Sequence, residues 1–143
     1  MDFVSAAAIS LSGMQVEQTR LDVAAMNLAN VHTTRTAGGG VYRPLGVVSS
    51  PSGQLPFSSF LGGTDAPSIG AQVLSLQPLN TAPRMAYEPG HPDADAKGFV
   101  AYPGVDSTTE MVNVMTAVRA YEANVMVINA AKAMASKALT IGE

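Results

Sequence analysis

The sequence predicts an α+β fold in which long N- and C-terminal helices pair as a coiled coil, with a small, irregular, β-rich middle segment between them. All nine Pro lie between positions 44 and 103, and eleven of the thirteen Gly lie between 38 and 104. Both ends instead repeat apolar residues at heptad spacing. Because Pro and Gly interrupt helices, we expect three segments: a helix in 1–35, a β-rich segment in 36–105 and a helix in 106–143.

The N-terminal segment repeats apolar residues at a spacing that predicts one seam for a partner helix. Its members are Val4, Ala7, Leu11, Met14, Gln18, Leu21, Ala25 and Leu28, of which only Gln18 is polar. A second apolar stripe away from this seam contains Ile9, Val16, Val23 and Met26. A helix in a simple hairpin needs one such stripe, so the second predicts contacts with another subunit.

Short strands are predicted in the middle segment. Residues 41–48 and 71–79 are β-leaning runs between turn residues, and residues 95–104 form a tight turn that enters a strand. Pro44 and Pro78 favour edge or irregular strands. The stretch 49–70, rich in Pro, Ser and Gly, predicts a mobile low-complexity loop.

The C-terminal segment opens with "VDSTTE", where Ser107 and Glu110 have capping-box spacing and Asp106 is an alternative cap. No Gly or Pro follows before Gly142, which predicts one helix of roughly 32 residues, about 48 Å long. Its heptad seam contains Met111, Val114, Val118, Tyr121, Val125, Ile128, Lys132, Ala135 and Leu139. Its second stripe, also expected to contact other subunits, contains Val112, Met126, Val127, Met134 and Ile141.

Magnitudes indicate that both stripes are buried in the working state. Burying the large apolar residues of the C-terminal seam contributes on the order of 10–20 kcal/mol. Ordering the same helix costs on the order of 30–60 kcal/mol, which backbone hydrogen bonds offset only in part. We therefore expect other copies or other proteins to bury at least one stripe.

Asparagines mark the facing parts of both predicted helices. Asn27 and Asn30 lie one turn apart, and Asn113 and Asn124 are candidate partners on the C-terminal helix. Buried amides fix helix register by pairing across an interface, which is the role we prefer for Asn27. For Asn30 two interpretations stay open, the same register role and a C-terminal cap in the left-handed conformation.

Composition argues against several classes of protein. The net charge is −3 without a basic cluster, so a nucleic-acid partner is not expected. Cys is absent, which excludes disulfides and thiolate metal sites. The N-terminus lacks a basic leader, so we expect no cleaved signal peptide. The longest uncharged stretch, 44–64, is interrupted by Pro, Gly and Ser and does not predict a membrane span.

A dense set of candidate ligands lies in "EPGHPDADAKG", which contains Glu88, His91, Asp93 and Asp95. Its spacing matches neither an EF-hand nor a zinc signature, and its Pro and Gly favour turns, so we expect neither a metal nor a cofactor. The only candidate bases are His32 and His91, both beside predicted turns, and no nucleophile pairs with them. An enzyme is therefore not expected, although a small metal-dependent enzyme centred on His91 stays as an alternative.

Two stretches resemble bacterial flagellar proteins. "RLDVAAMNLANVHTT" resembles the N-terminal signature of the axial proteins of rod and hook, whose recurrent mark is "NLAN". "YEPGHPDADAKGFVAYPGVDSTTEMVNVMTAVRAYEANVMVINAAKAM" is similar to the C-terminal half of the FlgC-type proximal-rod proteins, and the chain length also fits that family. The sequence departs from the pattern at Val31–His32 and over 49–70.

The resemblance implies a structural subunit of the flagellar basal body. Such subunits are exported through the flagellar type III apparatus without a cleaved signal and assemble helically into the periplasmic rod, which transmits torque. It also implies that the paired helices line a central export channel. The implied partners are copies of the chain, other proximal and distal rod proteins, and the rod adaptor at the inner-membrane ring and export gate. A subunit of another secretion-type or tail-type helical assembly is the alternative.

Overall fold

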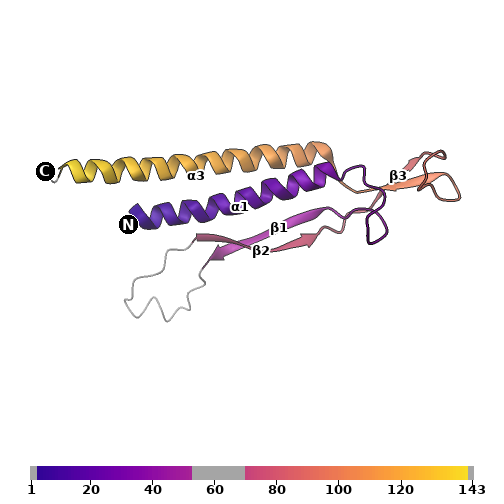
Figure 1. Ribbon diagram of the computed structural model, residues 1–143, viewed down its shortest axis with the longest axis horizontal. Coiled ribbons are helices and arrows are strands. Elements are labelled where there is room, and N and C mark those ends of the chain that lie inside the picture. The colour runs from indigo at the N-terminus through magenta and orange to yellow at the C-terminus, as the bar shows by residue number, and fades with distance from the viewer. Residues whose placement is uncertain (1–2, 53–69, 142–143) are drawn as a thin grey trace, which may run out of the picture.

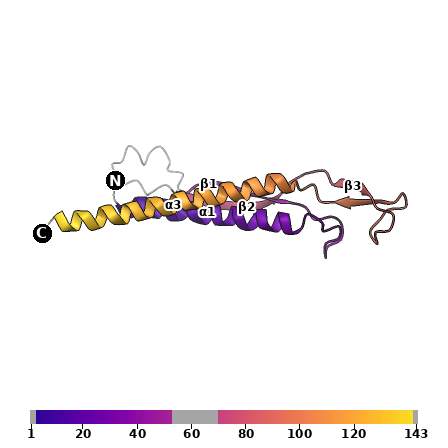
Figure 2. The same cartoon turned by 90° about the horizontal axis from the view of Figure 1, so that it is seen from above.

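The computed structural model describes residues 3–52 and 70–141. Its helices and strands confirm the α+β class and follow the order α1 (Phe3–Ala29), β1 (Leu45–Ser52), β2 (Gly70–Pro78), β3 (Arg84–Tyr87), β4 (Phe99–Tyr102) and α3 (Ser107–Ile141). The molecule is elongated. α3, α1 and the β1–β2 hairpin form three successive layers, and β3 and β4 lie beyond one end of them (Figures 1 and 2).

Helix α1 is the middle layer. It packs on α3 along one side and on β1 and β2 along another, whereas among the described elements α3 packs only on α1. A helix with partners on two sides has to bury more than one stripe. The buried residues of α1 are accordingly spread around it: Ser10, Val16, Val23, Ala24 and Asn27.

Helix α3 begins directly after Asp106, which is its N-terminal cap. The Asp106 carboxylate accepts hydrogen bonds from the Thr108 N–H (3.1 Å) and the Thr109 hydroxyl (2.7 Å). The capping expectation is therefore met by Asp106 rather than by Ser107. At 1.5 Å per residue, the 35 residues of α3 extend about 52 Å. Neither α1 nor α3, the helices of the described residues, has the length and hydropathy to cross a bilayer.

Strands β1 and β2 pair antiparallel from Leu45↔Pro78 to Ser52↔Gly70. A β-bulge interrupts the register, because Val48 pairs with Ser75 and Ser49 with Val73, which leaves Leu74 as the extra residue. In a two-stranded sheet both strands are edges, so Pro78 is tolerated. The predicted loop 49–70 was too wide, since 49–52 and Gly70 belong to the hairpin; residues 53–69 lie outside the described part.

Strands β3 and β4 form the tip of the molecule. They pair antiparallel from Arg84↔Tyr102 to Tyr87↔Phe99. β4 lies in the strand predicted within 95–104, but β3 was missed because its four residues show no apolar alternation. Val100, with none of its surface exposed, and Tyr102 are the buried residues of this hairpin.

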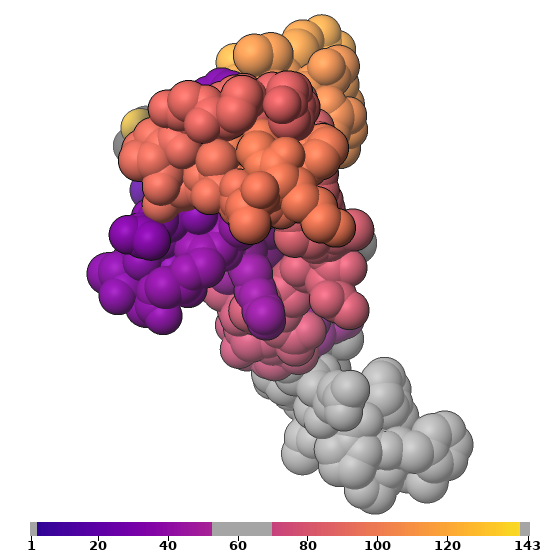
Figure 3. All heavy atoms as spheres, turned by 90° about the vertical axis from the view of Figure 1, so that its right-hand side faces the viewer, coloured from indigo at the N-terminus to yellow at the C-terminus, as the bar shows by residue number. Residues whose placement is uncertain are grey.

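The loop after α1 packs against the tip. The Thr34 hydroxyl donates to Asp93 Oδ2 (2.8 Å), Arg35 Nε lies 3.3 Å from Asp93 Oδ1, and the His32 ring meets the Tyr102 ring edge-on. Viewed along the long axis, this loop and the tip form one continuous end face (Figure 3). The tip is thus fastened to the C-terminal end of α1.

Candidate assembly interface

The outward side of α3 exposes eight large apolar side chains. They are Met111, Val112, Met115, Val118, Met126, Val127, Met134 and Leu139. Of the charged residues of this helix, Glu110 is half-buried, and the exposed ones are Arg119, Glu122, Lys132 and Lys137. Many exposed apolar side chains on one helix mark an interaction site, and Met adapts well to such contacts.

Exposed apolar residues also cover the other layers. α1 exposes Phe3, Val4, Ile9, Leu11 and Met26, and the hairpin exposes Val48, Leu74 and Leu76. The tip exposes Met85, Tyr87 and Phe99, of which Tyr87 and Phe99 meet edge-on with their ring centroids 5.3 Å apart. A single subunit therefore leaves apolar surface on each of its faces, which suits a protein that works inside an assembly.

The residues predicted for the coiled-coil seam divide into two groups. Half-buried in this subunit are Met14, Leu21, Leu28, Val114, Tyr121, Val125 and Ile128. The others point outward: Leu11 is 51% exposed, Met111 54% and Val118 38%. These three do not pack between α1 and α3 of one subunit, so any seam that they belong to lies between subunits.

Small residues take their place in the helix contact. The most buried residues of α3 are Ala117 and Ala131. They belong to a row in which the spacing alternates between four and three: Glu110, Val114, Ala117, Tyr121, Asn124, Ile128, Ala131 and Ala135, all at least half-buried. This row shares four members with the predicted seam, and every second member of that seam is absent from the row. The small side chains of Ala117 and Ala131 let α3 lie close to α1.

The residues predicted for contacts with other subunits also divide. Val16 and Val23 are buried inside this chain, so for them the prediction was wrong. They lie on the side of α1 that is covered by its neighbours within the subunit. Ile9, Val112, Met126 and Met134 are exposed and stay candidates for contacts with other subunits.

Asn27 pairs with a strand rather than with α3. It is 1% exposed, and its Nδ2 donates to the Leu45 carbonyl (2.9 Å) while its Oδ1 accepts from the Leu45 N–H (2.9 Å) and the Tyr42 hydroxyl (3.0 Å). The side-chain amide thus forms the pair of hydrogen bonds that the backbone of a neighbouring strand would form, and it fixes the start of β1 on α1. The predicted interhelical partner was wrong.

The remaining predicted asparagines have local roles. Asn30 ends α1: its Nδ2 donates to the Met26 carbonyl (2.9 Å) and its Oδ1 accepts from the Thr33 hydroxyl (3.1 Å), without a positive φ. Asn124 lies at the helix contact, where a Cβ added to Gly13 would be 3.1 Å from its Nδ2, but its hydrogen bond goes to the Ala120 carbonyl in its own helix. Asn113 is exposed.

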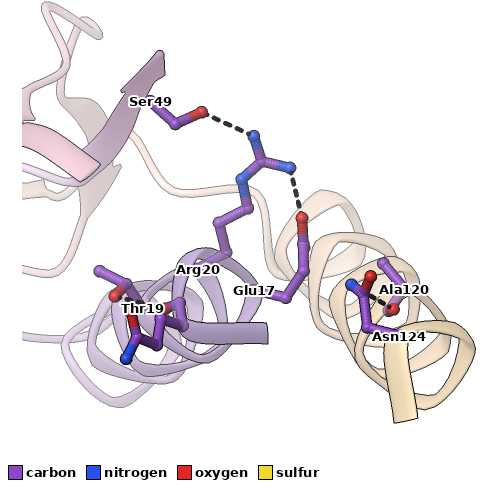
Figure 4. A network of polar contacts seen from close by, with 7 residues as sticks. Glu17, Thr19, Arg20, Ser49, Ala120 and Asn124 are labelled. Atoms are coloured by element: carbon purple, nitrogen blue, oxygen red, sulfur yellow. Dashed lines mark hydrogen bonds and ion pairs between the residues drawn. The ribbon is translucent and has the colours of Figure 1, made fainter. Parts of the chain in front are cut away.

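Three polar side chains of α1, about two turns apart, hold the hairpin. Besides Asn27, the Ser12 hydroxyl accepts from the Ala71 N–H (3.0 Å), and Arg20 Nη2 donates to Ser49 Oγ (3.2 Å). Arg20 also pairs with Glu17, which lies between α1 and α3 (Figure 4). Sequence reasoning missed Ser12 and Arg20; their shared spacing with Asn27 was the available signal.

A groove of about 310 Å³ opens between α1, β1 and α3. Val23, Ala24 and Ala117 give it apolar walls. Its charged groups are Glu110 and the ion pair of Glu17 with Arg20. Burial, and after it the nearby Glu110 carboxylate, raise the pKa of Tyr42, which hydrogen-bonds Asn27 beside the groove. The groove therefore combines apolar walls with one negative charge that no ion pair compensates among the described residues.

The candidate ligands of 88–98 hold the turn and the tip together. Asp95 Oδ1 accepts from the Lys97 and Phe99 N–H groups (2.8 and 2.9 Å), and His91 Nδ1 accepts from the Asp93 N–H (3.1 Å). The Tyr102 hydroxyl donates to Glu88 Oε2 (2.9 Å), and this bond raises the pKa of Tyr102. In residues 3–52 and 70–141, no three His, Cys, Asp or Glu side chains gather as metal ligands do.

Two regions of the chain match known protein families. Residues 8–35 match the family described as "Flagella basal body rod protein". Residues 96–141 match the family described as "Flagellar basal body rod FlgEFG protein C-terminal". These regions contain most of α1 and all of α3 together with β4.

Several relatives that match over nearly the whole chain have the same name. The chain is similar to the "Flagellar basal-body rod protein FlgC" of Borreliella burgdorferi, with 36% identity over 99% of this chain and 98% of the relative. It is 38% identical to that of Escherichia coli O6:H1 over 94% of each chain. The protein of the same name from Bacillus subtilis is 37% identical over 94% of this chain and 95% of its own length.

Proposed function

Because the chain belongs to the FlgC family of flagellar basal-body rod proteins, and is therefore a structural subunit of the rod, we propose that it assembles helically with other subunits into the proximal part of that rod. The observation that carries the proposal is the outward face of α3, which exposes eight large apolar side chains. Exposed apolar side chains in this number mark a surface that neighbouring subunits cover.

The proposed core of the assembly is the helix pair of segments 1–35 and 106–143, wound as a coiled coil around an export channel. The alternating three and four residue spacing of the contact row on α3 supports such winding. Segment 36–105, with the hairpin and the tip, then lies outside the tube. In this arrangement the outward residues of α3 contact neighbouring helices.

The proposed partners are copies of the chain, the other proximal and distal rod proteins, and the rod adaptor at the inner-membrane ring and export gate. We further propose that the chain leaves the cell interior through the flagellar type III apparatus without a cleaved signal and becomes part of the periplasmic rod. Laterally bound pairs of long helices resist twisting, so a rod built from them transmits torque.

The alternatives have less support. The relatives are rod proteins, which does not favour a subunit of another secretion-type or tail-type assembly. For the same reason the chain is not an enzyme, and the hypothesis centred on His91 is set aside.

Hydrogen exchange tests the proposed assembly directly. The purified chain and the same chain within isolated basal bodies are compared, with far-UV circular dichroism of the purified chain as a check of helix content. We expect α1 and α3 to exchange fast when free and slowly in the basal body, because neighbours supply much of their burial. Equal protection of both helices in the free chain contradicts assembly-dependent folding, and absence of the chain from basal bodies contradicts the rod function.

A further inference from the structure

The groove between α1, β1 and α3 has an unpaired acidic group at its edge. Glu17 pairs with Arg20 (3.0 Å). Glu110 is half-buried, and over the described ranges no cation lies within ion-pair distance of its carboxylate. A partly buried carboxylate without a counter-ion attracts a cation, since water solvates it incompletely. The groove thus favours a positively charged occupant that also presents apolar side chains.

The groove has a volume of about 310 Å³ and opens to the surface. It can therefore take side chains that project from a helix lying across its opening.

The far end of α3 has the matching chemistry. Beyond Glu122, the charged residues of this helix are Lys132 and Lys137, and neither is in an ion pair within the described part of the chain. Met134 and Leu139 are exposed beside them. α3 is 35 residues long and α1 is 27, and the last residues of α3 extend beyond the N-terminal end of α1 (Figures 1 and 2).

The two ends of α3 cannot meet within one subunit. The groove is lined by Thr116, and Lys137 lies 21 residues further along the same helix, about 32 Å away at 1.5 Å per residue. The contact therefore joins different subunits and is heterologous, the type that extends into a helix rather than closing into a dimer. Another copy of this chain presents the same lysines and apolar side chains at this end of its α3.

We propose that this groove receives the C-terminal end of the C-terminal helix of an adjoining copy of this chain. A lysine of that helix lies against Glu110, and its apolar side chains lie against Val23 and Ala117. This inference rests on the proposed function, since it needs rod neighbours. The proposed contact gives the assembly a direction, because the C-terminal end of α3 in one subunit lies on the N-terminal end of α3 in the next.

Site-specific photo-cross-linking tests the inference. Thr116 is exposed in the groove and is replaced by p-benzoylphenylalanine in cells whose only copy is this variant; Lys97, exposed on the tip, is the control position. After irradiation, basal bodies are isolated and the cross-linked peptides are identified by mass spectrometry. We expect position 116 to capture the C-terminal end of α3 of another copy of the chain and position 97 to capture other peptides.

A second variant tests the charge. We expect Glu110→Gln to lower the cross-linking yield at position 116 several-fold, and Asp22→Asn, at an exposed position of α1 that does not line the groove, to leave the yield unchanged. If position 116 prevents incorporation, the probe is moved to Asn113, which also lines the groove. Capture of any other segment, or no capture in basal bodies that contain the variant, overturns the inference. Absence of the unmodified chain from basal bodies overturns the proposed function instead.

Discussion

At the scale of single residues, two polar side chains fix where strand β1 and helix α3 begin. The buried amide of Asn27 donates to the Leu45 carbonyl and accepts from the Leu45 N–H, so both backbone groups of the first residue of β1 have hydrogen-bond partners. Asp106 satisfies a free N–H at the start of α3. Both groups compensate backbone polar atoms that regular structure leaves unpaired.

Asn27→Ala leaves the N–H and the carbonyl of Leu45 without partners. Each buried unpaired group costs roughly 1–3 kcal/mol, so we expect the Leu45 amide to exchange at least about tenfold faster in isolated basal bodies. Asn129→Ala, at an exposed position of α3, is the matched control. Unchanged exchange at Leu45 in Asn27→Ala would show that the amide does not hold β1.

Acid should weaken the start of α3. The hydrogen bonds from the Thr109 hydroxyl and the Thr108 N–H lower the pKa of Asp106 below its ordinary value of 3.8. Because the pKa of the folded state is the lower one, the stabilisation is fully present above pH 3.8 and is lost as the pH falls through the pKa of the folded state.

We expect the protection of amides 108–112 in basal bodies, corrected for intrinsic exchange, to fall in that acid range. Asp106→Asn keeps an acceptor oxygen but does not titrate as a carboxylate there, so this part of the pH dependence should disappear in the variant. A variant with the same pH profile as the wild type would assign the effect to another group.

At the scale of elements, the two helices pack through small residues. Gly13 lies in the middle of α1, where Gly costs about 1 kcal/mol relative to Ala, and Asn124 of α3 occupies the space that a side chain would take. Ala117 and Ala131 are the most buried residues of α3. Close approach of the helices therefore places bulky Met and Val on the outside.

Gly13→Val should push the helices apart. Overpacking of this kind costs about 1–3 kcal/mol, and we expect reduced swimming in soft agar together with faster exchange in α1. Asn124→Ala in the same chain should restore both by making room. Ala8→Val, at an exposed position of α1, should be close to wild type. Failure of Asn124→Ala to rescue would mean that the two residues do not share this space.

At the scale of the whole molecule, the three layers α3, α1 and the β1–β2 hairpin leave part of their apolar surface exposed. α1 is covered on two sides, but α3 has only α1 beside it in the described structure, and the hairpin has a bare outward face. Other subunits have to supply the missing layers.

Met126→Lys should block incorporation into the rod without disturbing the packing inside one subunit. The side chain is 64% exposed in the subunit, so we expect the substitution to change the folding free energy of a single subunit by no more than about 0.5 kcal/mol. Within an assembly the same charge would be buried without a partner. Immunoblots of isolated basal bodies measure incorporation, and Met126→Leu is the control. Normal incorporation of Met126→Lys would exclude this position from the interface.

The sequence by itself determined the two terminal helices, the α+β class, the cap at Asp106 or Ser107 and the family, since heptad spacing, the distribution of Pro and Gly, and local motifs act over a few residues. Only the tertiary structure decided which faces are buried. Periodicity favours the bulkiest stripe as the seam, whereas α1 and α3 meet through Gly13, Ala117 and Ala131, and Asn27 binds a strand 18 residues away. Burial depends on which layer covers which side, and that is set by the arrangement of all three layers together.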